Sequence, residues 1–271
     1  MMSLAGAIAS KAGSRSRLTP LPRVRSFRSA CMQPMALPVL HRGGLRAMAA
    51  GQGLAPRLTP HSPGAGLTAE QETVYNRVLE DRGKTAAKGG FPVTNADGSL
   101  VGPWNAMVAS PTIGSLIERM GSFCRHQNSC PADLFEIGIL VVGAEWKSQF
   151  EWYAHERLAL KAGLSPEAIE KIKQRVSPNE MSGMTSIQLA VYAYAKELHD
   201  VKRVSDATHA RALQAVGGER ALVDLVFTMG FYHQISMMLN AFNVPLPPGE
   251  SAPFEEPDMP RNHSPASSSK L

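Results

Sequence analysis

Apolar residues recur every three or four positions along most of the chain between residues 68 and 242. The clearest case is 185–201, a strongly periodic segment with Ile187, Leu189, Val191, Tyr192, Ala195 and Leu198. No segment shows the alternation of apolar and polar residues that marks a strand. The pattern therefore predicts an all-α protein. The expected helices start at residue 68 and then cover 104–108, 111–123, a run of helices within 131–175, 185–201, 205–217 and 219–242.

The stretch 131–163 is the most informative part of this pattern. Its first half is apolar on all sides, which predicts a buried helix, yet it carries one carboxylate, Glu136. A buried carboxylate is costly unless it has a partner. In the second half Ser148, Glu151 and His155 have the spacing that shares one helical face, and Gly163 is placed to end that helix. We expect this second helix to fold back so that its polar face meets Glu136.

Glu136, Glu151 and His155 are therefore the predicted catalytic residues. A carboxylate beside an imidazole sets its tautomer, and two nearby carboxyl groups push their pKa values apart. This combination can transfer protons, with His155 as the best acid/base candidate. From the pattern alone, a solvated face or a satisfied core pair explains these residues as well. Three potential ligands without a fourth histidine make a poor metal site, so we predict no metal.

The same residues resemble the carboxymuconolactone decarboxylase-like family, which includes the alkylhydroperoxidase D proteins. Glu136 matches the glutamate of that family's apolar helix, and His155 together with 158–159 and 162–165 matches its His-x-x-x-Ala-x-x-x-Gly-Leu-Ser motif. The peroxidase branch has a Cys-x-x-Cys pair before the histidine, where this chain has Ser148 and Glu151. The segments 102–106 and 230–245 extend the resemblance over roughly residues 70–248.

The resemblance implies a compact all-α domain that forms ring-like homo-oligomers, either trimers or hexamers. It implies a cofactor-free lyase that acts on a small carboxylated lactone or related ring. From the residues themselves we place Ser148 and Trp152 at the rim of the site; packing is the alternative role for Trp152, as it is for Trp104. Two alternatives remain open: a peroxidase like the cysteine-bearing branch, which Ser148 and Glu151 disfavour, and a non-catalytic scaffold that binds a ligand.

Charge is distributed unevenly. Residues 1–69 hold nine of the 28 basic residues and no acidic one, which leaves 19 basic against 23 acidic residues in the rest. The basic excess thus belongs to the N-terminal segment, and we expect neither nucleic acid nor a membrane as a partner. The three cysteines, Cys31, Cys124 and Cys130, give no disulfide framework and no Cys-x-x-Cys pair, so we expect structural thiols.

These features predict three parts. Residues 1–66, rich in Ala, Ser, Arg, Gly and Pro, have the composition of a plastid or mitochondrial transit peptide, with 45–50 as a plausible processing region. Residues 67–248 form the helical domain. Residues 249–271 form a Pro/Ser-rich disordered tail that ends in Ser269-Lys270-Leu271, a signal read by the peroxisomal import receptor.

Overall fold

The computed structural model describes residues 54–89 and 92–257, with side chains described outside 84–91. This part of the chain is helical, and its only extended pairing is an isolated antiparallel bridge between Thr94 and Leu100. The prediction of an all-α fold is confirmed. The helices are α1 (Ala69–Gly89), α2 (Trp104–Ala109), α3 (Pro111–His126), α4 (Ala132–Trp146), α5 (Gln149–Ala162), α6 (Pro166–Lys173), α7 (Ser186–Val201), α8 (Asp206–Val216) and α9 (Glu219–Ala241), with 3₁₀ turns at Pro63–Ala65 and Pro178–Glu180.

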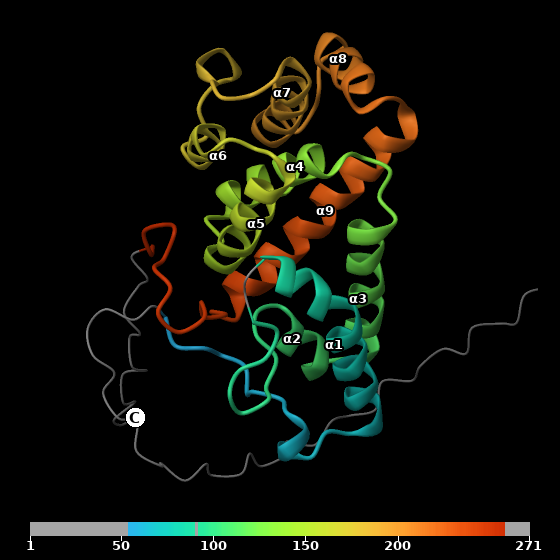
Figure 1. The fold of residues 1–271 in the computed structure, drawn as a ribbon, viewed down its shortest axis with the longest axis vertical. Coiled ribbons are helices and arrows are strands. Elements are labelled where there is room, and N and C mark those ends of the chain that lie inside the picture. The colour runs from blue at the N-terminus through green and yellow to red at the C-terminus, as the bar shows by residue number, and fades with distance from the viewer. Residues whose placement is uncertain (1–53, 90–91, 258–271) are drawn as a thin grey trace, which may run out of the picture. The chain divides into compact units, whose positions relative to one another are not determined.

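Helix α4 lies at the centre, packed against α5, α9, α7 and α6 (Figure 1). Eleven consecutive residues, from Leu134 to Ala144, are buried, as its all-round apolar sequence requires. Lys147 then adopts a left-handed conformation and Ser148 is the N-cap residue of α5. This tight turn reverses the chain and lays α5 along α4.

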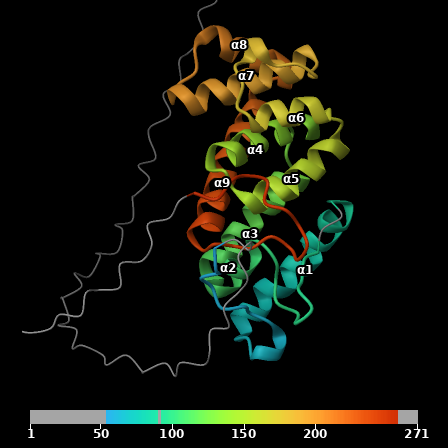
Figure 2. The same cartoon turned by 90° about the vertical axis from the view of Figure 1, so that its left-hand side faces the viewer.

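The remaining helices lie at the two ends of this central group. Figure 2 shows α7 and α8 at one end and α1, α2 and α3 at the other, with α4, α5 and α9 between them. The predicted helix ends are confirmed where capping groups define them. Thr68 and Gln71 form reciprocal hydrogen bonds at the start of α1, Ser165 caps α6, and Gly163 ends α5 in the left-handed conformation.

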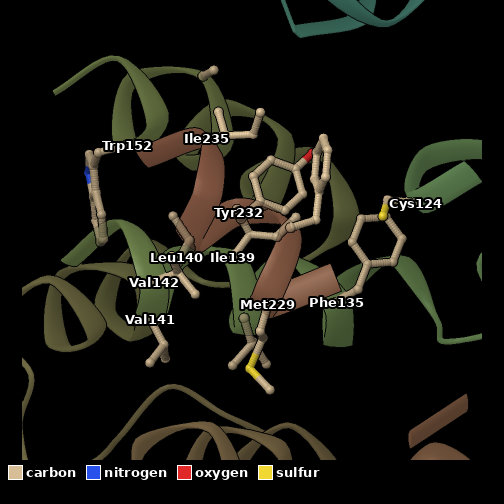
Figure 3. Packing of buried hydrophobic residues seen from close by; sticks show 14 of the residues in the cluster. Cys124, Phe135, Ile139, Leu140, Val141, Val142, Trp152, Met229, Tyr232 and Ile235 are labelled. Atoms are coloured by element: carbon tan, nitrogen blue, oxygen red, sulfur yellow. The ribbon is translucent and has the colours of Figure 1, made fainter. Parts of the chain in front are cut away.

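One apolar core joins α4, α5 and α9 (Figure 3). Within the described residues α9 alone is long and apolar enough to span a membrane by length and composition, although no such run was expected from the sequence. Other helices bury 56% of its most apolar window. This burial is what a core helix shows.

Several expectations fall outside the described residues. These are the transit peptide up to residue 53, the processing region at 45–50, and the terminal Ser269-Lys270-Leu271 signal.

Candidate functional site

Glu136 meets His155 across the α4–α5 pair. Both side chains are buried, and Nδ1 of His155 lies 2.7 Å from Oε2 of Glu136. The Lys147–Ser148 reversal makes this contact possible, because it turns one face of α5 back onto α4. This contact joins two of the three residues predicted to be catalytic, and the third, Glu151, lies against the other side of the same imidazole.

Arg125, near the C-terminal end of α3, contacts both Glu136 and His155. Its Nη1 donates to Oε1 of Glu136 at 3.0 Å, and its Nη2 donates to the Tyr232 hydroxyl of α9 at 2.6 Å. The same Nη2 lies 2.9 Å from Nε2 and 3.3 Å from Nδ1 of His155, so the guanidinium sits against the imidazole. The Arg125 cation therefore contacts residues from three helices, α4, α5 and α9.

These contacts define the protonation of the pair. Burial alone would raise the pKa of Glu136, but His155 and Arg125 beside it outweigh burial and lower that pKa, so the carboxylate is ionised. Burial, helped by the Arg125 charge, lowers the pKa of His155 despite the neighbouring Glu136. The neutral imidazole therefore donates from Nδ1 to Glu136 and keeps an unprotonated Nε2.

Glu151 lies one helical turn before His155, with Oε1 3.3 Å from Nε2. Within the described part of the chain this oxygen has no hydrogen-bond partner. Burial raises the pKa of Glu151 well above its ordinary value, the Glu136 charge acts in the same direction, and Arg125 only partly opposes them. Glu151 is thus a neutral acid beside a neutral base. Burial also raises the pKa of Tyr232, which keeps its phenolic proton.

Arg125, Glu151, His155 and Tyr232, together with Arg82 of α1, are the polar residues that line a cavity of about 60 Å³. The other walls come from apolar side chains of α2, α5 and α9, among them Trp104, Phe150 and Phe231. Gly102 has a φ of +67°, and a Cβ there would lie 2.4 Å from the Phe150 ring, so glycine is needed where this loop closes over the cavity. The cavity is largely apolar, and its polar groups converge on one side.

The two residues predicted at the rim lie elsewhere. Ser148 is fully buried in the α4–α5 turn and does not line the cavity. Trp152 is also fully buried, packs edge-to-face with Phe254, and lies apart from Tyr232 in Figure 3. The prediction for these two residues was wrong. Helical spacing predicts which side chains share a face, but it does not predict which part of the protein packs against that face. Trp104, which comes earlier in the chain, lines the cavity wall instead.

The thiols are separate from this chemistry. Cys124 and Cys130 are free and buried, and burial raises the pKa of both, that of Cys130 to about 12. Neither lines the cavity. A neutral, buried thiol is a poor nucleophile. Among the described residues, no group of three His, Cys, Asp or Glu side chains is placed to hold a metal ion.

A second polar chain links α4, α9 and α7. Trp146 Nε1 donates to Nδ1 of His233 at 2.6 Å, which leaves the His233 proton on Nε2. That nitrogen donates to Nε2 of His199 at 2.7 Å, and His199 Nδ1 donates to the Ala195 carbonyl. His233 is thus hydrogen-bonded through both of its ring nitrogens. Burial lowers the pKa of both histidines, that of His233 to about 4.

Three polar residues that line the cavity, Arg82, Arg125 and Tyr232, were not predicted. Arg125 lies one residue after Cys124, and its sequence position near the end of α3 does not reveal which helix it faces. For Tyr232 the sequence offered one signal, because the segment 230–232 belongs to the family resemblance. That signal did not show which side chain Tyr232 contacts.

The described helices have the alkylhydroperoxidase D-like all-α fold. An uncharacterized peroxidase-related protein from Ralstonia eutropha JMP134, with an alkylhydroperoxidase AhpD core, superposes with a TM-score of 0.55 at 13% identity, over 70% of this chain and 92% of that one. The debrominase Bmp8, solved in complex with 2,3,4-tribromopyrrole, gives a TM-score of 0.52 at 9% identity, over 70% and 91%. No family model matches the sequence. No curated protein matches it either.

Proposed function

We propose that this chain is a cofactor-free acid/base enzyme, and more narrowly a carboxymuconolactone decarboxylase-like lyase that acts on a small carboxylated lactone or related ring. The observation that carries this proposal is the pairing of a neutral acid, Glu151, with a neutral base, His155, at the wall of a small, largely apolar cavity. Two groups held in complementary states can give and take one proton near neutral pH.

In the proposed reaction the carbon–carbon bond to the substrate carboxylate breaks and carbon dioxide leaves. The electron pair moves through the ring to the lactone carbonyl oxygen, where the donors Arg125 and Tyr232 stabilise the negative charge. Glu151 then protonates the ring carbon and regains its proton from solvent, with His155 as the relay. The apolar wall formed by Phe150 and Trp104 favours the step in which the carboxylate loses its charge.

The cavity size adds a condition. A cavity of about 60 Å³ is smaller than the roughly 150 Å³ that holds a benzene ring in a protein core. The proposal therefore includes an outward movement of the wall at Pro103, Trp104 and Phe150 when a ring enters. The segment before α2 is the natural part to move, because Gly102 gives it backbone freedom.

Peroxide reduction is the second candidate, favoured by the AhpD-core protein that shares the fold. It needs a reactive thiol, and the positions of the cysteine pair hold Ser148 and Glu151. A non-catalytic ligand-binding scaffold is the third, and it predicts binding without turnover.

The test is a turnover screen of carboxylated lactones, enol-lactones and hydroperoxides with the full chain, followed by ultraviolet absorbance and carbon dioxide release. With a substrate in hand, His155→Ala should lower kcat about a hundredfold or more. His209→Ala, at an exposed histidine of α8, is the matched control and should keep full activity. Full turnover in His155→Ala would overturn the proposal, and so would ligand binding without turnover across the panel.

A further inference from the structure

Arg82 of α1 brings a second cation to the cavity. It lines the cavity together with Arg125, and only 6% of the residue is exposed. The proton transfer proposed above leaves Arg82 without a role. Burial lowers its pKa, and the charge of Arg125 acts in the same direction, so an anion beside the two groups would stabilise both.

Two backbone carbonyls of α3 fix the position of this guanidinium. Nη1 of Arg82 donates to the Gly121 carbonyl at 3.2 Å, and Nη2 donates to the Glu118 carbonyl at 3.1 Å. Gly121 also leaves the space that the group occupies, because a Cβ there would lie 2.5 Å from Nη2. The two acceptors and the missing side chain at residue 121 therefore hold the guanidinium in one place.

These contacts leave Arg82 with unused donors. A guanidinium has five N–H groups, and the two carbonyls take one from each terminal nitrogen. Nε lies 3.3 Å from Oδ2 of Asp81, but within the described part of the chain neither atom has a hydrogen-bond partner. The other oxygen of Asp81 accepts from Ser122 and lies 3.2 Å from Nε2 of His126. Arg82 can thus donate to a further acceptor.

The polar side chains that line the cavity carry two positive charges and no negative one. Glu136 and Asp81, the carboxylates beside the two arginines, are not among the lining residues. Glu151 is a neutral acid, His155 a neutral base, and Tyr232 keeps its phenolic proton. A ligand with an anionic group is the electrostatic complement of such a surface.

We propose that Arg82 is the specificity-determining residue of the cavity, and that its guanidinium holds an acidic substituent that the substrate keeps through the reaction. An arginine pairs with a carboxylate through two parallel hydrogen bonds. The carboxylate that leaves is a poor partner, because a cation bound to it would stabilise the charge that the reaction removes. The inference rests on the proposed lyase function for its reaction step, whereas the binding of an acidic ring is independent of turnover.

Binding of a matched pair of ring compounds tests the inference. The probes are furan-2-carboxylate and furan-2-carboxamide, which share a ring and nearly the same size but differ in charge. Titration calorimetry with the full chain should show that the wild type binds the carboxylate about tenfold or more tightly than the carboxamide. Arg82→Gln should lose this preference. Arg77→Gln, at a half-buried arginine of α1 outside the cavity, is the matched control and should keep it.

Three results of this titration would overturn the inference: no binding of furan-2-carboxylate to the wild type, equal affinity for the two probes, or an undiminished preference in Arg82→Gln. A residue that only ties α1 to α3 predicts the last of these, together with a lower melting temperature.

Arg82→Lys covers the case in which Arg82→Gln does not fold. A lysine ammonium is a point charge that cannot form the paired contact, so this variant should bind furan-2-carboxylate about tenfold more weakly and the carboxamide as before. Circular dichroism checks that each variant keeps its helices. Wild-type affinity of Arg82→Lys for the carboxylate would also overturn the inference.

Turnover separates this inference from the proposed function. With a substrate in hand, Arg82→Gln should raise KM about tenfold or more and leave kcat nearly unchanged, because the retained group is bound equally before and during the reaction. A loss confined to kcat would overturn the role of Arg82. Carboxylate binding that depends on Arg82, without turnover in the screen, would overturn the lyase and keep that role. Turnover together with equal binding of the two probes would do the opposite.

Discussion

The carboxylate of Glu136 and the imidazole of His155 face each other across the α4–α5 pair, with 2.7 Å between Oε2 and Nδ1. Nineteen residues separate them in the sequence, and only the reversal at Lys147–Ser148 brings them together. The contact fixes the tautomer of His155 and directs its unprotonated Nε2 toward Glu151. The state of this imidazole therefore depends on a residue from another helix.

Replacement of the paired carboxylate tests that dependence. Glu136→Gln keeps the shape but loses the charge that balances Arg125, so we expect turnover to fall about a hundredfold. The pKa of His155 should fall further, because its anionic neighbour raises it in the wild type. The pH–rate profile of kcat/KM would report both changes. A variant with the wild-type profile and rate would show that Glu136 is only structural.

Glu151→Gln should stabilise the protein in a pH-dependent way. The unfolded carboxyl group loses its proton near its ordinary pKa of 4.5, whereas the buried one retains it to much higher pH. Between those values the folded state binds more protons, so the stability of the wild type falls as pH rises. The advantage of Glu151→Gln should grow from pH 5 to pH 8, to about 1 kcal/mol or more. Thermal unfolding at several pH values measures this, and an advantage independent of pH would contradict the assignment of Glu151 as a neutral acid.

Arg125→Lys tests the guanidinium. A lysine ammonium is a point charge and cannot donate at once to Glu136, Tyr232 and the substrate oxygen. We expect kcat to fall at least tenfold, with a smaller change in KM, because the donor acts on charge that develops in the reaction. Arg157→Lys, at a half-buried arginine of α5 outside the cavity, serves as the control. Equal losses in the two variants would point to a general stability effect.

The chain of Trp146, His233 and His199 predicts a loss of stability in acid. Both histidines fold in the neutral form, and the pKa of His233 is about 4 against 6.5 in its ordinary state. As pH falls from 6.5 to 4 the unfolded state takes up the protons first, so the free energy of unfolding falls by about 1–3 kcal/mol. Lys202 and Arg175 add to the lowering for His199, and Asp200 opposes it.

Replacing both His199 and His233 by Phe should flatten this dependence, as followed by urea unfolding between pH 4 and 7. The exposed His209→Phe supplies the control. A double variant with the wild-type slope would assign the acid sensitivity to other groups.

Thiol chemistry should be dispensable. The double variant Cys124→Ser, Cys130→Ser places hydroxyl groups in buried sites, so we expect a loss of about 1–3 kcal/mol in stability with turnover nearly unchanged. If the wild type reduces hydroperoxides and this variant does not, the peroxidase alternative replaces the lyase.

The sequence by itself determined the helical class and the ends of most helices. Periodicity and caps are local: Thr68 with Gln71, Ser165 and Gly163 act within four residues of where they stand. It also determined that Glu136 needs a partner, because an apolar helix with one carboxylate cannot leave that group buried alone. His155 and Glu151 were found because the family pattern and helical spacing point to the same face.

Only the tertiary structure decided which groups surround that face. Arg125 comes from α3 and Tyr232 from α9, and their positions depend on how α3 and α9 pack against α4 rather than on any local pattern. The same packing buried Ser148 and Trp152 away from the cavity and brought Trp104 to its wall. Spacing along one helix fixes the direction of a side chain relative to that helix, but the neighbour it meets depends on the sum of many weak contacts across the whole core.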